Sequence, residues 1–237
     1  MDQTITLKSL LEAGLHFGHR AHRWNPKMKP YIFGKRNGIY IVDLEKTIER
    51  LRVAYDAVRN VSEAGQDIMF VGTKQQARPI IKEEAERCGA FYVTERWIGG
   101  ILTNFDVVSS RITRMVSLER MISADDYGDA TKKEAILMRR EHDKLAKMFG
   151  GVRDMDRLPG ALFLIDPMRE DTALAEARRI KIPVIALIDT NGNPDNIDYP
   201  IPGNDDALRS IKLVAGTIAN AVLEGRKEHE VEPAEAV

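Results

Sequence analysis

The sequence predicts an α/β fold built on a doubly wound, mostly parallel sheet, and its short apolar runs are the main reason. These runs are four or five residues long and almost continuously apolar, and they lie at residues 67–71, 90–93, 161–165 and 184–188. Strands that are buried on both faces of a parallel sheet have this composition. Segments of helical length separate the runs, and this alternation predicts helices on both faces of the sheet.

The remaining elements of the sheet domain follow from helical spacing and from their order along the chain. Helices are expected at residues 75–87, 170–180 and 205–223, and a further short strand at 199–201. A long helix is expected at residues 44–64, because its apolar residues recur at intervals of three and four, as one buried helix face requires.

The N-terminal part predicts a short helix and a β-hairpin. The helix is expected at residues 7–13, where Gly14 ends it. The Asn37-Gly38 dipeptide lies between apolar runs at 31–33 and 39–42, and this dipeptide favours the tight turn of a hairpin. We therefore expect a pair of strands directly before the long helix.

Residues 105–150 break the alternation of strands and helices. Apolar side chains recur at helical spacing along two segments, a polar turn lies between them at 125–129, and Gly150-Gly151 closes the unit. Two antiparallel helices packed along a narrow apolar seam are expected, forming a coiled-coil hairpin that projects from the sheet domain. Contact with a partner is the favoured role of this projection, and internal support is the alternative.

The chain is therefore expected to divide into a sheet domain, an inserted hairpin and a tail. The sheet domain comprises residues 1–104 and 151–225, and the helical hairpin comprises 105–150. Residues 226–237 are acidic and carry little apolar surface, so a disordered tail is expected.

Composition excludes several classes of protein. A chain of 237 residues with 43% hydrophobic and 30% charged residues is typical of soluble globular proteins. No apolar run approaches the ~20 residues of a membrane helix or forms a signal-peptide core, so a cytoplasmic protein without a membrane partner is expected. The single cysteine, Cys88, excludes an internal disulfide and a Cys-rich zinc site, and it is expected at the end of a helix as a packing residue.

The charge of the chain is balanced overall but uneven along its length. Lys and Arg number 35 against 36 Asp and Glu, a net charge of −1. Residues 1–60 carry 11 basic and 6 acidic side chains, whereas residues 161–237 carry 8 and 14. This polarity suggests that one face meets phosphate while another faces solvent or a protein.

Residues 16–36 combine positive charge with aromatic side chains. No acidic residue occurs between positions 13 and 42, and the segment holds six cations: Arg20, Arg23, Lys27, Lys29, Lys35 and Arg36. Four aromatic residues are interleaved with them: Phe17, Trp24, Tyr31 and Phe33. Cations spaced by aromatics suit the unstacked bases and irregular backbone of folded RNA. Pro26 and Pro30 favour an extended segment. A basic surface loop without a ligand is the alternative.

Several sequence blocks resemble one known family in the order in which they occur. They are SLLEAGLHFGHR (9–20), RWNPKMKPYIFGKRNGIYIVDLEKT (23–47), FVGTKQQA (70–77), RWIGGILTN (96–104), LPGALFLIDP (158–167), IPVIALIDTNGNPD (182–195) and IPGNDDALRSIKL (201–213). From about residue 6 to residue 226 the chain resembles the ribosomal protein S-two (uS-two) family of the small subunit, in its bacterial form.

This resemblance implies a structural, non-catalytic role in translation. It implies binding to small-subunit rRNA and to neighbouring ribosomal proteins, and docking of ribosomal protein S-one, which captures messenger RNA. It also implies a flavodoxin-like α/β domain with a coiled-coil insertion, in agreement with the elements predicted above.

Further RNA contacts are expected outside the basic segment. Lys74 and Arg78 lie where a predicted strand leads into a helix, and a plain strand-to-helix connection is the alternative. Near the paired glycines 99 and 100, RWIGGILTN offers Arg96, Trp97 and Asn104, although Trp97 in the core of a tight turn is also consistent. The predicted hairpin adds four cations: Arg111, Arg114, Lys132 and Lys133.

A metal site and an enzyme are the less favoured interpretations. His16, His19 and His22 lie three residues apart but lack a neighbouring cysteine or carboxylate to complete a tetrahedral site. An enzyme that binds a nucleotide or a sugar phosphate is the alternative function on this scaffold. Residues 71–74 (VGTK) lack parts of a phosphate-binding loop, and G-x-G-x-x-G is absent. We therefore expect no cofactor and no small-molecule substrate.

Overall fold

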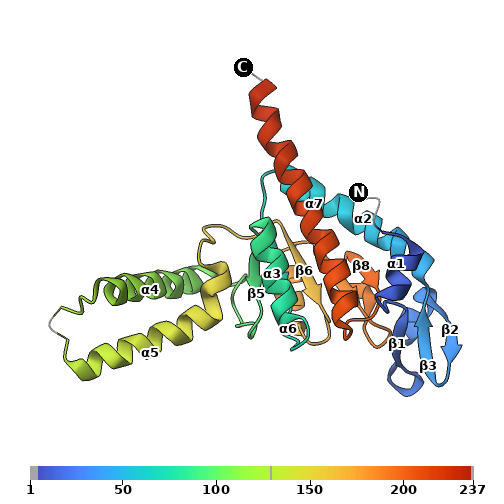
Figure 1. The fold of residues 1–237 in the computed structure, drawn as a ribbon, viewed down its shortest axis with the longest axis horizontal. Coiled ribbons are helices and arrows are strands. Elements are labelled where there is room, and N and C mark those ends of the chain that lie inside the picture. Colours follow the sequence, from blue (N-terminus) through green and yellow to red (C-terminus); the bar gives the residue numbers. More distant parts are fainter. Residues whose placement is uncertain (1–4, 129, 236–237) are drawn as a thin grey trace.

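The computed structural model describes residues 5–128 and 130–235, with the side chains of 230–235 left aside (Figure 1). Its main element is a five-stranded parallel sheet with the order β5-β4-β6-β7-β8. The strands are β4 (Ile68–Val71), β5 (Phe91–Val93), β6 (Ala161–Ile165), β7 (Val184–Ile188) and β8 (Tyr199–Pro202). This is the strand order of flavodoxin-like sheets. The predicted α/β fold with a parallel sheet is confirmed.

Helices cover one face of the sheet with a continuous apolar core. They are α2 (Leu44–Glu63), α3 (Arg78–Cys88) and α7 (Leu208–Glu235). Because side chains alternate along a strand, Phe70 and Phe163 point into this core, where their rings meet edge to face at 5.3 Å. Cys88, the last residue of α3, is buried there.

The other face of the sheet packs on a second core. The alternate strand residues, such as Met69 and Leu162, are buried here with α6 (Asp171–Arg179) and with residues 97–102. The base of the helical insertion joins the same core through Val108 and Phe149. Helices and loop segments on both faces explain why the strands are apolar on both sides.

The insertion consists of α4 (Phe105–Ala124) and α5 (Lys132–Phe149), followed by the short 3₁₀ helix η3 (Gly150–Val152). Figure 1 shows the two helices side by side, projecting from the β5 side of the sheet domain. Val108, Ile112, Met115 and Leu118 of α4 and Leu145 and Phe149 of α5 are buried. Supercoiling of this pair, like the predicted domain boundaries, stays a prediction.

A buried carboxylate on α6 holds the loop that leads into the insertion. Glu176 accepts hydrogen bonds from Trp97 Nε1 (3.0 Å), from the backbone N–H groups of Gly100 (2.7 Å), Leu102 (3.1 Å) and Thr103 (3.2 Å), and from Thr103 Oγ1 (3.1 Å). Burial alone would raise the pKa of Glu176, but these donors stabilise its charge and lower the pKa. Glu176 therefore fixes where the insertion leaves the sheet domain.

The N-terminal part forms a separate three-stranded antiparallel sheet of order β1-β3-β2. It follows α1 (Leu7–Glu12) and comprises β1 (Phe17–Arg20), β2 (Ile32–Arg36) and β3 (Ile39–Val42). Asn37 and Gly38 have φ of 50° and 77°, as the turn between β2 and β3 requires, so the predicted hairpin is confirmed. β1 was not predicted, because its sequence FGHR has no apolar alternation and its partner β3 lies about twenty residues away.

The expected extended segment around the two prolines is wrong. Residues between β1 and β2 form two 3₁₀ helices, η1 (Ala21–Arg23) and η2 (Pro26–Tyr31). Pro26 is tolerated at the first position of η2, where no backbone N–H is needed, and the Asn25 side chain caps it by accepting from Lys27 N (3.0 Å). The last short helix, η4 (Pro194–Asn196), begins in the same way.

The C-terminal helix is longer than expected. Disorder is predicted from residue 226, whereas α7 continues to Glu235. Arg226 donates to Asp67 (2.8 Å) and to the carbonyls of Cys88 and Gly89, and the His229 ring lies 2.8 Å from the Glu63 carbonyl oxygen. These contacts attach the helix to the sheet domain. Residues 236–237 lie outside the described residues, and no described helix is long and apolar enough to cross a membrane.

Candidate nucleic-acid interface

The N-terminal cations are exposed, as an interface requires. All six basic side chains predicted between residues 20 and 36 lie on the surface. Lys27 forms an ion pair with Asp195. Among the described residues, the other five form no ion pair: Arg20, Arg23, Lys29, Lys35 and Arg36. Their charges are therefore available to a polyanion, and their role as RNA contacts stays a prediction.

The segment that carries these cations is attached to the end of β7. His19 N donates to Thr190 Oγ1 (2.8 Å), and Asn25 N donates to the Thr190 carbonyl (2.8 Å). At Gly18 a Cβ atom would lie 2.5 Å from Thr190 Cγ2, so only glycine permits this approach. The segment thereby lies against the edge of the sheet where the parallel strands end.

The aromatic side chains of the segment differ in what they can contact. Trp24 is half-buried against Tyr40, with ring centroids 4.8 Å apart. Tyr31 lies beneath the Arg50 guanidinium, 5.8 Å from its ring centroid. Phe33 is 80% exposed. Trp24 therefore offers at most one free face, whereas Phe33 is open to a partner.

An apolar groove lies between α1 and the N-terminal sheet. Its volume is about 810 Å³, and Leu11, Phe17, Phe33 and Ile41 line it. Basic side chains from the end of β2 line the same groove. An exposed apolar surface with a basic margin suits a protein segment as well as a base.

Lys74 is surrounded by carboxylates, which disagrees with its predicted contact to RNA phosphate. Its Nζ lies 2.6 Å from Asp205, 2.6 Å from Asp206 and 3.5 Å from Asp166, and its side chain is only 12% exposed. Burial would lower the pKa of Lys74, but the three carboxylates raise it above its usual value. Burial, together with repulsion from Asp166 and Asp189, raises the pKa of Asp205 to about 7. Lys74 therefore neutralises charge inside the protein.

The three histidines are not brought together. The His16 ring lies beside Phe17, with centroids 3.9 Å apart, and His22 is exposed. His19 Nδ1 lies 3.0 Å from Asp189 and Nε2 lies 3.7 Å from Asp206, both at the strand ends. The hydrogen bond to Asp189 raises the pKa of His19.

The surroundings of His19 include the carboxylates that a cation site would need. Ligand atoms of His19, Asp189 and Asp206 lie within 4.8 Å of one another. The sequence argument that carboxylates are lacking near the histidines is therefore wrong for His19, because both acids come from distant positions. The His19 ring already contacts Asp189, and the Lys74 ammonium group already contacts Asp206.

The other predicted RNA contacts in the sheet domain follow β4 and β5, and they differ in how exposed they are. Arg78 donates to the Thr73 carbonyl (2.9 Å) and to Glu95 (3.3 Å), so its charge is partly neutralised. Trp97 is buried with its N–H on Glu176, which disagrees with a role in stacking on RNA. Arg96 and Asn104 are exposed.

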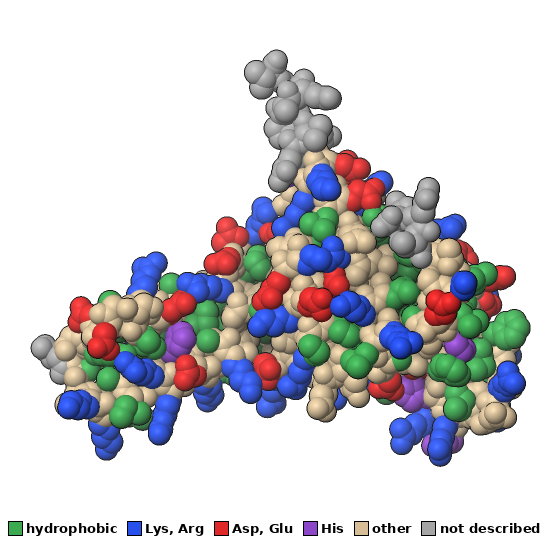
Figure 2. Space-filling model, in the orientation of Figure 1, with side chains coloured by type: hydrophobic (Ala, Val, Ile, Leu, Met, Phe, Trp, Pro, Cys, Tyr) green, Lys and Arg blue, Asp and Glu red, His purple; other side chains and the backbone are tan. Residues whose placement is uncertain are grey.

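The predicted cations of the insertion also differ: one is paired with a carboxylate, and the other three are exposed. Arg114 forms a bidentate pair with Glu141 across the helices, at 3.2 and 2.9 Å. Arg111, Lys132 and Lys133 are exposed. Figure 2 shows Lys and Arg side chains along the insertion and along the lower margin of the sheet domain.

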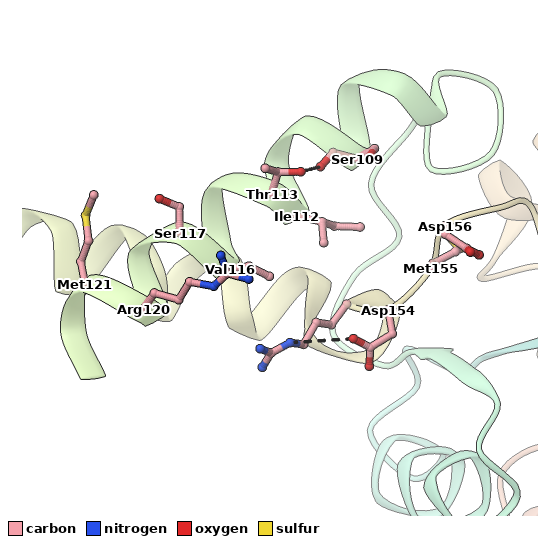
Figure 3. Close-up of a pocket in the computed structure, with 11 residues that line it drawn as sticks. Ser109, Ile112, Thr113, Val116, Ser117, Arg120, Met121, Asp154, Met155 and Asp156 are labelled. Atoms are coloured by element: carbon pink, nitrogen blue, oxygen red, sulfur yellow. Dashed lines mark hydrogen bonds and ion pairs between the residues drawn. The ribbon is translucent and has the colours of Figure 1, made fainter. Parts of the chain in front are cut away.

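A groove beside α4 is less suited to RNA than this basic margin. Figure 3 shows Ser109, Thr113, Ser117 and Arg120 on one side of it, facing the loop that carries Asp154 and Asp156. Its volume is about 600 Å³. Arg153 of this groove is paired with Glu119 (2.8 Å), and Asp154 and Asp156 line the groove as well, so it shows no preference for phosphate.

Sequence reasoning did not identify Arg169. This exposed residue follows β6 and lines a crevice of about 410 Å³ together with Arg96 and Thr73. The sequence around Arg169 does not mark it as a site residue, because residues 168–172 (MREDT) contain a single basic side chain. The parallel pairing of β5 and β6 with β4 places it near Arg96, which follows β5.

Comparison with known proteins identifies the family to which this chain belongs. Residues 10–225 match the model of the family described as Ribosomal protein S2. The chain is 53% identical over 221 residues to small ribosomal subunit protein uS2 of Geotalea uraniireducens, covering 93% of this chain and 86% of that protein. It is 52% identical over 225 residues to uS2 of Treponema pallidum subsp. pallidum, covering 95% and 77%. The chain therefore belongs to the ribosomal protein S2 (uS2) family, whose members are structural proteins of the small ribosomal subunit and not enzymes.

Proposed function

We propose that this protein binds small-subunit rRNA chiefly through the exposed cations of its N-terminal segment. The observation that carries the proposal is that Arg20, Arg23, Lys29, Lys35 and Arg36 form no ion pair among the described residues, although carboxylates surround Lys74 nearby. Cations without internal partners attract phosphate over a longer range and gain more from contact with it. Arg111, Lys132 and Lys133 of the insertion extend this surface.

The proposed function includes contacts with neighbouring proteins, among them ribosomal protein S-one. The apolar groove between α1 and the N-terminal sheet supports this part, because Phe33 and Leu11 are exposed large apolar side chains. Replacing Phe33 by Ala should reduce capture of purified S-one by subunits that contain the variant. Subunits with Val53→Ala, which removes an exposed apolar residue of α2, serve as the control. Equal capture by both would contradict the proposed docking surface.

The rRNA interface is tested by replacing three exposed cations together. The variant Arg20→Ala, Arg23→Ala, Lys29→Ala should bind subunits more weakly, and the dependence of log K on log salt should become shallower by about 0.7 to 0.9 for each lost phosphate contact. The measurement is sedimentation with small subunits lacking this protein, over a series of salt concentrations.

A matched control removes the same charge elsewhere. Arg52, Arg178 and Arg179 are exposed and form no ion pair among the residues that the structure describes. Their triple alanine variant should keep the salt dependence of the original protein. If both variants bind equally well, and circular dichroism shows both folded, the N-terminal segment is not the main rRNA contact.

A further inference from the structure

A polar crevice lies at the point where the parallel sheet changes its direction of winding. From β4 the chain moves outward to β5, and it then returns to the other side of β4 to form β6. The loops after these three strands line the crevice through Thr73, Arg96 and Arg169. In open α/β sheets, the ends of the strands at such a point form the usual site for a ligand.

The two arginines of this crevice keep free hydrogen-bond donors. Arg169 Nε donates to Thr73 Oγ1 (3.1 Å), which orients the guanidinium and leaves its terminal nitrogens without a protein partner within the described chain. Arg96 is exposed and forms no ion pair among the described residues. A planar guanidinium offers paired donors that match the oxygens of a phosphate group.

The carboxylates of the crevice are already engaged. Glu170 is buried and accepts the backbone N–H of Thr73 (2.8 Å), and its burial raises its pKa. Glu95 faces Arg78 at 3.3 Å and Lys147 at 3.5 Å. Glu95 is therefore neutralised by cations outside the crevice, and burial disfavours the charged form of Glu170, so the two arginines keep a preference for an anion.

We propose that this crevice binds a phosphate group through Arg96 and Arg169, and that the phosphate belongs to the backbone of rRNA. This assignment rests on the proposed function and adds Arg169 to its contacts. The crevice lies on the same edge of the sheet as the N-terminal segment, which is attached beyond β7 through Thr190. One RNA surface can therefore contact both.

The backbone around the crevice favours RNA over a free nucleotide. Proteins that bind free nucleotides present several backbone N–H groups to the phosphates. Here Gly72 N donates to the Val93 carbonyl (3.0 Å), and Thr73 N donates to Glu170. With these donors used internally, the side chains hold the phosphate, which is typical of contacts to a nucleic-acid backbone.

The test compares two double variants of the full chain in subunit binding. Arg96→Ala, Arg169→Ala should bind small subunits lacking this protein more weakly than Arg178→Ala, Arg179→Ala, which removes the same charge from the other end of α6. The salt dependence should become shallower by about 1.4 to 1.8 for two lost phosphate contacts. Arg169→Lys should recover only part of the affinity, because an ammonium lacks the paired donors.

Further comparisons distinguish a lost crevice contact from misfolding and from failure of the proposed function. Arg96→Ala alone removes a side chain without an ion pair, so it tests the crevice even if Arg169→Ala disturbs Thr73. Equal binding by the crevice and control variants, with the N-terminal triple variant still impaired, would overturn the crevice assignment and leave the proposed function intact. Unimpaired binding by all of them would overturn both.

The thermal stability of the free protein, measured with adenosine monophosphate and with inorganic phosphate, identifies the source. No stabilisation at millimolar concentration, together with impaired subunit binding, supports rRNA. Stabilisation that requires Arg96 and Arg169, with unimpaired subunit binding, would overturn the assignment to rRNA.

Discussion

The N-terminal segment that carries Lys29 and the loop that carries Lys74 both lie at the ends of parallel strands, but the two lysines differ in what surrounds them. Lys29 is exposed and has no ion pair among the described residues, whereas Lys74 has three carboxylates within 3.5 Å. Lys29 belongs to the 3₁₀ helix η2 and Lys74 to the loop after β4, and sequence reasoning assigned both to RNA. The acids that the fold places around a basic residue therefore decide how much of its charge is open to a polyanion.

The largest expected effect is on the stability of the fold, which should depend on Lys74 much more than on Lys29. Lys74→Ala leaves buried Asp205 without its cation, and removing one partner of a buried ion pair costs about 3 to 5 kcal/mol. Lys29→Ala should change the free energy of unfolding by less than about 0.5 kcal/mol. Urea unfolding of both variants measures this, and equal free energies would contradict the internal role of Lys74.

A smaller loss of stability is expected on replacing Glu176, a second buried charge, which holds the loop that leads into the insertion. Glu176→Gln replaces a carboxylate that accepts five hydrogen bonds by an amide whose NH₂ group faces donors. The free energy of unfolding should fall by about 2 kcal/mol at neutral pH. Hydrogen exchange should quicken at Gly100, Leu102 and Thr103, whose N–H groups lose their acceptor.

The same variant predicts a dependence on pH. The pKa of Glu176 in the folded protein is below the ordinary value of 4.5. A group with a lowered pKa stabilises the fold above its unfolded pKa, and this contribution disappears as pH falls through the folded pKa. The difference in stability between the original protein and Glu176→Gln should therefore be constant near pH 7 and shrink below about pH 4.5. A difference that grows on acidification would contradict this.

The smallest effect is expected on subunit binding and concerns Lys27, which shares features with both Lys29 and Lys74. It is exposed, like Lys29, but it forms an ion pair with Asp195. Lys27→Ala should therefore reduce the salt dependence of subunit binding by less than Lys29→Ala, for which about 0.7 to 0.9 is expected. Asp195→Asn should strengthen binding slightly, because it frees the Lys27 charge. Identical effects of Lys27→Ala and Lys29→Ala would show that the ion pair does not compete with RNA.

Much of the fold could be predicted because its signals are local. The apolar runs of β4, β6 and β7 are strands buried on both faces, and their composition reports that burial directly. Helical spacing identifies α2 and the two helices of the insertion in the same way. β1 and the continuation of α7 were not predicted, since β1 depends on pairing with β3 and the end of α7 on Arg226 reaching Asp67.

Periodicity and a local lack of acids need no tertiary contact, so the sequence alone predicts buried segments and the basic character of residues 20–36. Which cations remain available depends on the tertiary structure. Asp205 lies 131 residues from Lys74, and Glu176 lies 79 residues from Trp97. Parallel strands bring such distant positions to one edge of the sheet, where electrostatic attraction and burial act over a few ångströms irrespective of separation along the chain.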